Sequence, residues 1–351
     1  MKRVPRRTAG VASVAAAAVF ALGLSACGGD DSTSTSGGAS TDASGAVSGK
    51  VNLIAYSTPQ DVYEKELEPG FNDSTGSDVD FANSFAASGD QSRAVEAGQP
   101  ADLVHFAREP DMTRLVDAGL VDADWNSDEY DGILQNSVVT FVVRGGNPKN
   151  ITTWDDLLRD DVSVITPNPF TSGGATWNIM AAYGQVIENG GTEDEALQFV
   201  SDMLANTAVQ DASASDALET FTSGEGDVLL SYENEAIRAQ DAGEDVDYVI
   251  PDDTILIQTP AAVPTNAENP EAAQAFLDYL HSDEGQTIFA ENGYRPVDEA
   301  VAEKFKKDFP EPKDLFTIED FGGWDTVQTD FFDSENGSIA KIESDLGVTT
   351  G

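Results

Sequence analysis

Short apolar strands alternate with helices along most of this chain, and this alternation is the feature that most restricts its fold. VNLIAY (51–56) is a buried-type strand, and a helix is predicted after it at about 60–72. VDFANSF (79–85) and ADLVHFA (101–107) are the next two strands, and each is again followed by a helical stretch. Strands that alternate with helices pair in parallel, and the helices cover the faces of the sheet. The sequence therefore predicts an α/β protein with mostly parallel sheets.

A second run of alternation follows a long β-branched strand, SVVTFVVRGGNP, at 137–148. DVSVITPNP starts the pattern again, and GDVLLSYENEA (226–236) repeats it. The segment TILIQTPAAVPTN, at 254–266, predicts a strand that crosses back to the first half. An apolar stripe that begins near a proline and ends at a glycine predicts one helix over 270–293.

Two similar halves joined by crossing strands predict two lobes with a cleft between them. We assign 50–138 and 262–351 to lobe one, and 139–261 to lobe two. Ligands of open α/β sheets bind beyond the carboxyl ends of the strands, where the loops meet. The polar loops of this chain fall at strand-to-helix junctions, so we expect them to converge on the cleft.

The N-terminus has the pattern of an export signal rather than of a folded element. A basic stretch, MKRVPRR, precedes an Ala-, Val- and Leu-rich segment (8–24) and then LSAC at 24–27. LSAC has the form of a bacterial lipobox, and Cys27 is the one cysteine of the chain. We therefore predict a lipoprotein signal peptide over 1–27, with Cys27 as the lipidated residue. The alternative is an ordinary cleaved signal with an incidental cysteine.

Residues 28–48 consist almost wholly of Gly, Ser, Thr, Ala and Asp, a composition typical of a flexible tether. No later apolar run approaches the roughly 20 residues that a membrane-spanning helix needs. A lipidated cysteine, a tether and a folded body together predict a protein anchored at the extracellular face of the plasma membrane.

The charge and cysteine content exclude several classes of function. The chain has 63 acidic and 19 basic residues, for a formal net charge of -44. Nucleic-acid binding depends on basic surface, so we expect no nucleic-acid partner. A single cysteine leaves no disulfide framework, thiolate nucleophile or cysteine metal site.

Residues suited to catalysis are sparse. The sequence has no G-x-S-x-G motif and only two histidines, His105 in a buried-type strand and His281 near the middle of the last long helix, and we interpret both as packed or solvated. The acidic loop at 122–133 lacks the glycine and glutamate that a calcium loop has at its sixth and twelfth positions. We predict no metal site, no cofactor and no enzymatic activity. A secreted hydrolase that uses Ser172 is the remote alternative.

The stretch PNPFTSGGATWN, at 167–178, predicts an anion-binding site. Ser172, Gly173 and Gly174 come directly before a helix, where free backbone N–H groups attract negative charge. The stretch is not a nucleotide-binding P-loop, because it lacks the G-K-[ST] ending. A cradle without lysine or arginine favours a small anion held by neutral donors.

Several motifs together resemble the sulfate-binding proteins of ABC importers, and most closely the lipid-anchored actinobacterial members. These motifs are SVITPNPFTSGGATWN, GDVLLSYENEA, ASGDQS, FVVRGGNPKN, GYRPVD and FTIEDFGGW, and the resemblance covers about 50–340. It implies the two-lobed type II periplasmic-binding-protein fold. It also implies a monomer that captures sulfate in its cleft and delivers it to the transmembrane subunits of an ABC permease, which a cytoplasmic ATPase drives.

The resemblance implies seven residues that bind sulfate through neutral donors: Ser57, Ser88, Ser172, Gly173, Gly174, Ala214 and Tyr232. The hydroxyls of Ser172 and Tyr232 would donate, and the other residues would donate through backbone N–H groups. A site made only of donors favours sulfate, because phosphate near neutral pH carries a proton that needs an acceptor.

The chain departs from the family pattern at three places. Ser57 stands where many relatives have aspartate, Tyr232 where tryptophan is common, and Ser215 and Asp216 where an arginine often follows Ala214. A carboxylate that faced the ligand would repel sulfate, so we expect Asp216, like Asp90 in the ASGDQS motif, to point to solvent.

Three alternatives remain open at this level. The ligand could be thiosulfate, molybdate, tungstate or another tetrahedral oxyanion. The protein could be the hydrolase mentioned above. It could also be a sensor that passes its closed state to a membrane receptor instead of delivering a solute.

Overall fold

The structure, a computed structural model, describes residues 46–350. The predicted signal peptide, Cys27 and nearly all of the predicted tether lie outside the described residues. Within the described residues, no helix is both long enough and apolar enough to cross a membrane.

The strands form a continuous ten-stranded sheet in the order β2-β1-β3-β9-β4-β7-β5-β6, with β10 beside β9 and β8 beside β4. Their bounds are β1 (Ser48–Tyr56), β2 (Asp78–Ala86), β3 (Leu103–His105), β4 (Ile133–Arg144), β5 (Val164–Ile165), β6 (Thr207–Val209), β7 (Val228–Tyr232), β8 (Val246–Val249), β9 (Asp253–Ala262) and β10 (Asp314–Phe316).

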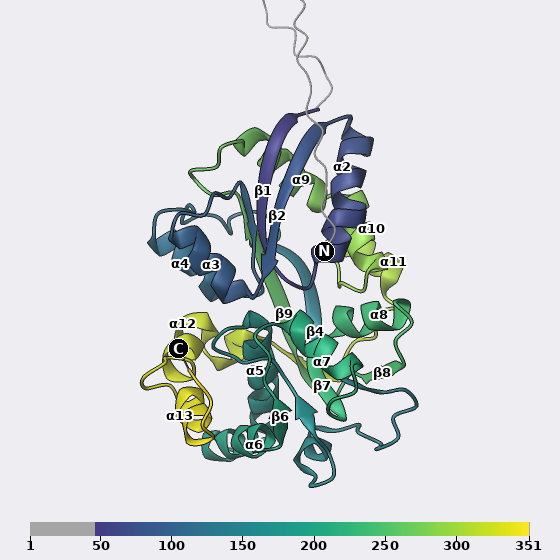
Figure 1. Cartoon of the computed structure of the whole chain (residues 1–351), viewed down its shortest axis with the longest axis vertical. Coiled ribbons are helices and arrows are strands. Elements are labelled where there is room, and N and C mark those ends of the chain that lie inside the picture. The colour runs from purple at the N-terminus through teal and green to yellow at the C-terminus, as the bar shows by residue number, and fades with distance from the viewer. Residues whose placement is uncertain (1–45, 351) are drawn as a thin grey trace, which may run out of the picture. The chain divides into compact units, whose positions relative to one another are not determined.

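Helices connect most of these strands (Figure 1). Their bounds are α1 (Gln60–Val62), η1 (Tyr63–Leu67), α2 (Glu68–Thr75), α3 (Ser88–Glu96), α4 (Glu109–Asp117), η2 (Trp154–Leu158), α5 (Gly173–Glu188), α6 (Glu193–Ala205), α7 (Ala214–Thr222), α8 (Glu233–Asp241), α9 (Pro270–Leu280), α10 (Asp283–Glu291), α11 (Glu299–Phe305), η3 (Ile318–Phe321), α12 (Gly323–Asp330) and α13 (Ser338–Asp345).

The first lobe is the part of the sheet formed by β1, β2 and β3 with helices on both faces. β1 pairs in parallel with β2 and β3. Val51, Leu53 and Ala55 point to one face, where they pack in a core with residues of α2, α9 and α10. Ile54, which points to the other face, packs with residues of α3 and α4. This alternation is the period-2 pattern of a strand buried on both faces.

The second lobe repeats this arrangement around the far end of β4 with β5, β6, β7 and β8. Val139, Phe141 and Val143 of β4 pack in a core with residues of α5 and α6. Val142, which lies between them, packs on the opposite face with residues of α7 and α8. The structure therefore confirms an α/β fold of two lobes, each a sheet with helices on both faces.

β4 and β9 join the lobes. They run antiparallel, in a register that pairs Ile133 with Pro260 and Val138 with Leu256. β9 continues to pair with β3 of the first lobe, and β4 continues to pair with β7 of the second. Both strands that the sequence predicted to cross between lobes are present and lie side by side.

Two features differ from the sequence-based prediction. The C-terminal segment 314–345 packs on the second lobe, although the sequence assigned all of 262–351 to lobe one. Phe316, Trp324 and Ile339 share the hydrophobic core of α5 and α6, and β10 pairs with β9 at its second-lobe end. Segment 314–345 packs on the second lobe because its apolar residues cover the apolar side of α5.

The helix predicted over 270–293 is two helices, α9 and α10. His281 is the C-cap of α9 rather than a mid-helix residue, and the Ser282 hydroxyl caps α10 by accepting a hydrogen bond from the Gly285 N–H (3.2 Å). A Cβ on Gly285 would lie 2.3 Å from the Tyr279 carbonyl oxygen, so the corner depends on glycine.

Candidate anion-binding site between the lobes

All seven residues that the sequence assigned to the anion site line one small cavity. The complete lining consists of Tyr56, Ser57, Thr58, Ala87, Ser88, Ala107, Ser172, Gly173, Gly174, Ser213, Ala214 and Tyr232. The lining comes from both lobes, since β1, α3 and the segment after β3 belong to the first and α5, α7 and α8 to the second.

Four helices begin at this cavity: α3, α5, α7 and α8. Ser88, Gly173 and Ala214 are the first residues of α3, α5 and α7, and Tyr232 is the N-cap of α8. The N-terminus of each helix carries a partial positive charge, so all four helices favour an anion at the cavity.

The first backbone N–H groups of these helices are free for a ligand, because a helix uses its N–H groups only from the fourth position onward. In α3, the first helical bond runs from the Gln91 N–H to the Ala87 carbonyl oxygen (3.0 Å). The N–H group of Ser88 therefore precedes the hydrogen-bonded part of the helix. Gly173 and Ala214 hold the corresponding first position in α5 and α7.

The first of the two glycines at the start of α5 is closely packed, and the second makes ordinary contacts. A Cβ on Gly173 would lie 3.0 Å from the Ala107 Cβ and 3.3 Å from the Ser88 Cβ, both in the first lobe. A Cβ on Gly174 would lie 3.4 Å from a ring carbon of Tyr232. Glycine at position 173 thus allows the start of α5 to approach the opposite lobe closely.

The hydroxyl groups of the lining differ in what they can offer. Tyr232 is 1% exposed, and its hydroxyl has no hydrogen-bond partner among the described residues. Burial raises the pKa of Tyr232 well above its usual value, so the hydroxyl stays protonated as a donor. Ser172 makes no capping hydrogen bond. The Ser88 hydroxyl, in contrast, accepts a hydrogen bond from the Ala107 N–H (3.0 Å) and donates one to Asp111 (2.7 Å). The backbone N–H is therefore the donor that Ser88 can offer to the cavity.

No lysine, arginine, histidine or carboxylate lines the cavity. Asp90 pairs with Arg93 (2.6 Å) and its side chain is 56% exposed. Asp216 is also exposed, and it accepts a hydrogen bond from the Ser213 hydroxyl (2.7 Å). Both aspartates point to solvent, as expected. Ser213 in turn caps α7, so a serine–aspartate pair supports this helix start.

Two buried carboxylates outside the lining, in α4 and α8, are paired with arginines. Asp111 pairs with Arg108 (3.2 Å), and Glu235 of α8 pairs with Arg238 (2.6 Å). Burial raises the pKa of Glu235, and the adjacent Arg238 opposes that shift. The cavity is therefore a set of neutral donors surrounded by compensated charges.

The geometry does not support a hydrolase centred on Ser172. His105 is fully buried between the Tyr63 hydroxyl (2.9 Å) and the Thr259 hydroxyl (3.1 Å), and burial lowers its pKa to about 3. His281 bonds to the Ile133 carbonyl oxygen. Neither histidine lines the cavity, so no general base is in position to activate the serine.

Sequence reasoning missed five lining residues: Tyr56, Thr58, Ala87, Ala107 and Ser213. Each is next in sequence to a predicted lining residue or ends a predicted strand, and that adjacency was the available signal. Tyr56 accepts a hydrogen bond from Gln135 of β4 (2.7 Å), and the Thr58 hydroxyl has no partner among the described residues.

The cavity is small. The space within it that is open to the centre of a water-sized sphere has a volume of about 10 Å³. Cavities for organic ligands are typically 300–1,000 Å³. The size, the helix N-termini and the neutral donors together suit a small anion.

Comparison with known proteins identifies the family of this chain. Residues 51–295 match the family described as bacterial extracellular solute-binding protein. The chain belongs to this family. A solute-binding protein captures its ligand without converting it, so the chain is a binding protein and not an enzyme.

Three relatives whose names state a ligand make the comparison more specific. A sulfate-binding protein of Synechococcus elongatus is 39% identical, with 98% of each chain covered. A thiosulfate-binding protein of Escherichia coli is 38% identical, with 77% of this chain and 82% of the relative covered. The solved structure of the sulfate-binding protein SubI from Mycobacterium tuberculosis is 44% identical, with a TM-score of 0.77, and the match covers 81% of this chain and 99% of SubI. The resemblance to sulfate-binding proteins found in the motifs is therefore confirmed.

Proposed function

We propose that this protein captures sulfate in the cavity between its lobes and delivers it to an ABC importer. The observation that carries this proposal is the convergence of four helix N-termini and an unpartnered buried hydroxyl on a cavity with no charged lining residue. Relatives named sulfate-binding proteins, which match over nearly the full chain, support the same ligand.

The physical chemistry of the cavity suits a fully ionised tetrahedral anion. A buried dianion needs compensation, and N–H donors at helix starts supply it with fixed dipoles. Each hydrogen bond to a charged group contributes about 1.5–3 kcal/mol. Several such bonds, less the costs of closure and desolvation, give about -8 kcal/mol, which corresponds to a micromolar Kd.

The lining also favours sulfate over phosphate. A protonated phosphate must donate a hydrogen bond, and no carboxylate lines the cavity to accept it. Thiosulfate is the second candidate ligand, because it is also a tetrahedral dianion and a relative at 38% identity is named for it. Molybdate and tungstate are larger and serve as size probes.

Anchoring and delivery complete the proposal. Cys27, in the lipobox, would attach the protein to the extracellular face of the plasma membrane, and residues 28–48 would tether the body. The closed protein, as a monomer, would release sulfate to the transmembrane subunits of a permease that a cytoplasmic ATPase drives.

Isothermal titration calorimetry of residues 28–351 tests the ligand. Sulfate, thiosulfate, phosphate and molybdate are titrated separately at low and high salt. We expect one-to-one binding of sulfate near micromolar Kd and no heat from phosphate. If molybdate or thiosulfate binds and sulfate does not, the assignment of sulfate as the ligand is refuted. If none of the four anions binds, the whole proposal is refuted.

A matched pair of variants then tests the location. Ser172→Ala removes a cavity hydroxyl and should weaken sulfate binding about tenfold or more. Ser127→Ala changes an exposed serine in the loop after α4 and should leave the affinity unchanged. Equal affinities in the two variants would place the ligand elsewhere.

A further inference from the structure

Two adjacent residues of the first lobe bond to two adjacent residues of the second. Arg108 Nη1 donates to Thr176 Oγ1 (2.9 Å), and Trp177 Nε1 donates to the Ala107 carbonyl oxygen (2.8 Å). All four residues are buried. Thr176 and Trp177 lie near the start of α5, just beyond the glycines that line the cavity.

Arg108 also reaches the other half of the cavity wall. Its Nε donates to Asp111 Oδ2 (3.2 Å), and the same oxygen accepts the Ser88 hydroxyl (2.7 Å). Ser88 is the first residue of α3 and lines the cavity. One guanidinium therefore joins the start of α3, through Asp111, to the start of α5, through Thr176.

We propose that Arg108 is a positioning residue that holds the two halves of the cavity together and slows release of the bound anion. The inference rests on the proposed function, because release is the step that it affects. Arg108 does not line the cavity, so it acts without contact with the ligand.

The guanidinium of Arg108 has a partner in the second lobe only when the cleft is closed. Arginine presents a planar fork of donors, and here one arm meets the first lobe and another the second. Separation of the lobes breaks the bond to Thr176 and the bond between Trp177 and Ala107. If Thr176 lost its hydroxyl, closure would bury an unpaired charged donor, which is costly. The closed state would then be less stable, while the open state would be unchanged.

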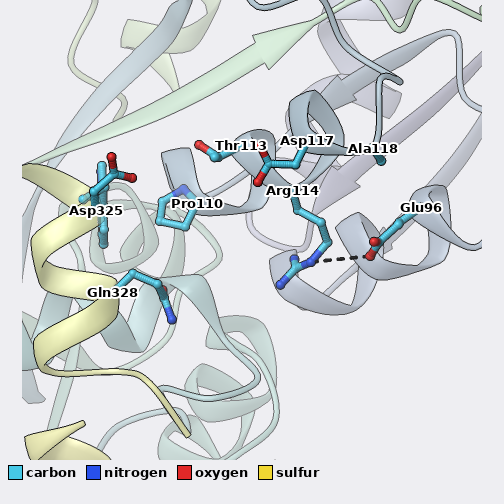
Figure 2. A pocket seen from close by; sticks show the side chains of 9 residues that line it. Glu96, Pro110, Thr113, Arg114, Asp117, Ala118, Asp325 and Gln328 are labelled. Carbon is cyan, nitrogen blue, oxygen red and sulfur yellow. Dashed lines mark ion pairs between the residues drawn. The ribbon is translucent and has the colours of Figure 1, made fainter. Parts of the chain in front are cut away.

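Arg114 supplies a matched control, because it pairs with the same carboxylate and reaches only the first lobe. It lies 3.4 Å from Asp111 Oδ1 and 3.6 Å from Glu96. Figure 2 shows its side chain pointing to Glu96, in a hollow of about 420 Å³ between α4 and α12. A change at Arg114 therefore disturbs Asp111 without breaking the bond across the cleft.

Release rates give the first test. Stopped-flow measurements compare sulfate dissociation from wild type, Thr176→Val, Arg108→Lys and Arg114→Lys, all made as residues 28–351, which contain every hydrophobic cluster described above. We expect koff to rise about tenfold in Thr176→Val and Arg108→Lys and to stay within twofold of wild type in Arg114→Lys. The association rate should change little, since the bond forms only on closure. Equal effects of the two arginine variants, or no effect of Thr176→Val, would overturn the proposal.

A second test does not need a known ligand. Residues 28–351 contain no cysteine, so cysteines placed at exposed Ser74 and Gln198, one in each lobe, accept a fluorophore pair. Single-molecule energy transfer then reports the closed fraction in the ligand-free protein. We expect Thr176→Val to lower this fraction relative to Arg114→Lys, and equal fractions would overturn the proposal. If wild type binds no oxyanion, the proposed function fails, and this comparison still decides the role of Arg108.

Discussion

Replacement of Tyr232 by phenylalanine should weaken anion binding and leave the stability of the ligand-free protein intact. The hydroxyl is buried in the cavity wall and has no partner among the described residues. The ring packs in the core of the second lobe, and phenylalanine preserves that packing. The substitution therefore removes a donor that only a ligand could use.

The magnitude follows from the type of hydrogen bond. A hydrogen bond to a charged group contributes about 1.5–3 kcal/mol, so the Kd for sulfate should rise roughly 10- to 150-fold. An unpaired buried hydroxyl costs free energy in the absence of ligand. The free energy of unfolding without ligand should thus be unchanged or rise by up to about 1 kcal/mol.

Calorimetry and chemical denaturation check the two quantities separately. Tyr183→Phe is the control, since Tyr183 is also a buried tyrosine near this core but lies on α5 away from the cavity. It should leave sulfate affinity unchanged. A Tyr232→Phe variant that bound sulfate as tightly as wild type would show that this hydroxyl does not contact the anion. A variant that lost stability without ligand would show that the hydroxyl has a structural partner.

Three further predictions test the site and its scaffold. Gly173→Ala should weaken sulfate binding at least tenfold, because the new Cβ would lie 3.0 Å from the Ala107 Cβ across the cleft. The stability of the ligand-free protein should not fall, since alanine favours helix. Calorimetry and thermal unfolding measure the two effects, and an unchanged affinity would contradict the close approach. Ser282→Ala should lower the free energy of unfolding by about 0.5–2 kcal/mol through loss of the α10 cap and leave affinity unchanged, as measured by urea denaturation and calorimetry. Burial raises the pKa of Glu68 to about 7, so the contribution of this group to the stability of the wild type is present below about pH 4.5 and is lost as the pH rises through 7. Glu68→Gln should therefore be more stable than wild type at pH 8, by about 1–2 kcal/mol, and similar to it at pH 4.5. Urea denaturation curves of the two proteins that differ equally at both pH values would contradict this.

The anion cradle was predictable from sequence because its parts are local. A strand end, a Ser-Gly-Gly turn and a helix start are consecutive in the chain, and a strand followed by a helix start recurs at Ser88 and Ala214. Parallel strands bring their carboxyl ends to one edge of a sheet, so the convergence of these helix starts follows from the order of elements. The two crossing strands were predictable for a similar reason, since β-branched and aromatic residues are enriched in strands and both segments carry runs of them.

Some elements escaped prediction although a local signal existed. α6 begins with a capping box in which Thr192 and Glu195 bond to each other's backbone N–H groups. The break between α9 and α10 depends on Ser282 as a cap within a continuous apolar stripe. Apolar periodicity alone does not separate two helices that share one buried face.

The sequence by itself determined the alternation of strands and helices, the crossing strands and the chemistry of the anion cradle, because periodicity, turn residues and helix caps act over a few residues. Only the tertiary structure decided that 314–345 covers α5 of the second lobe, since several apolar faces compete for each partner. It alone also decided that Arg108 meets Thr176 across the cleft, and that the Ser88 hydroxyl is taken by Asp111. These contacts join residues far apart in the chain, and their pairing depends on how two packed lobes meet.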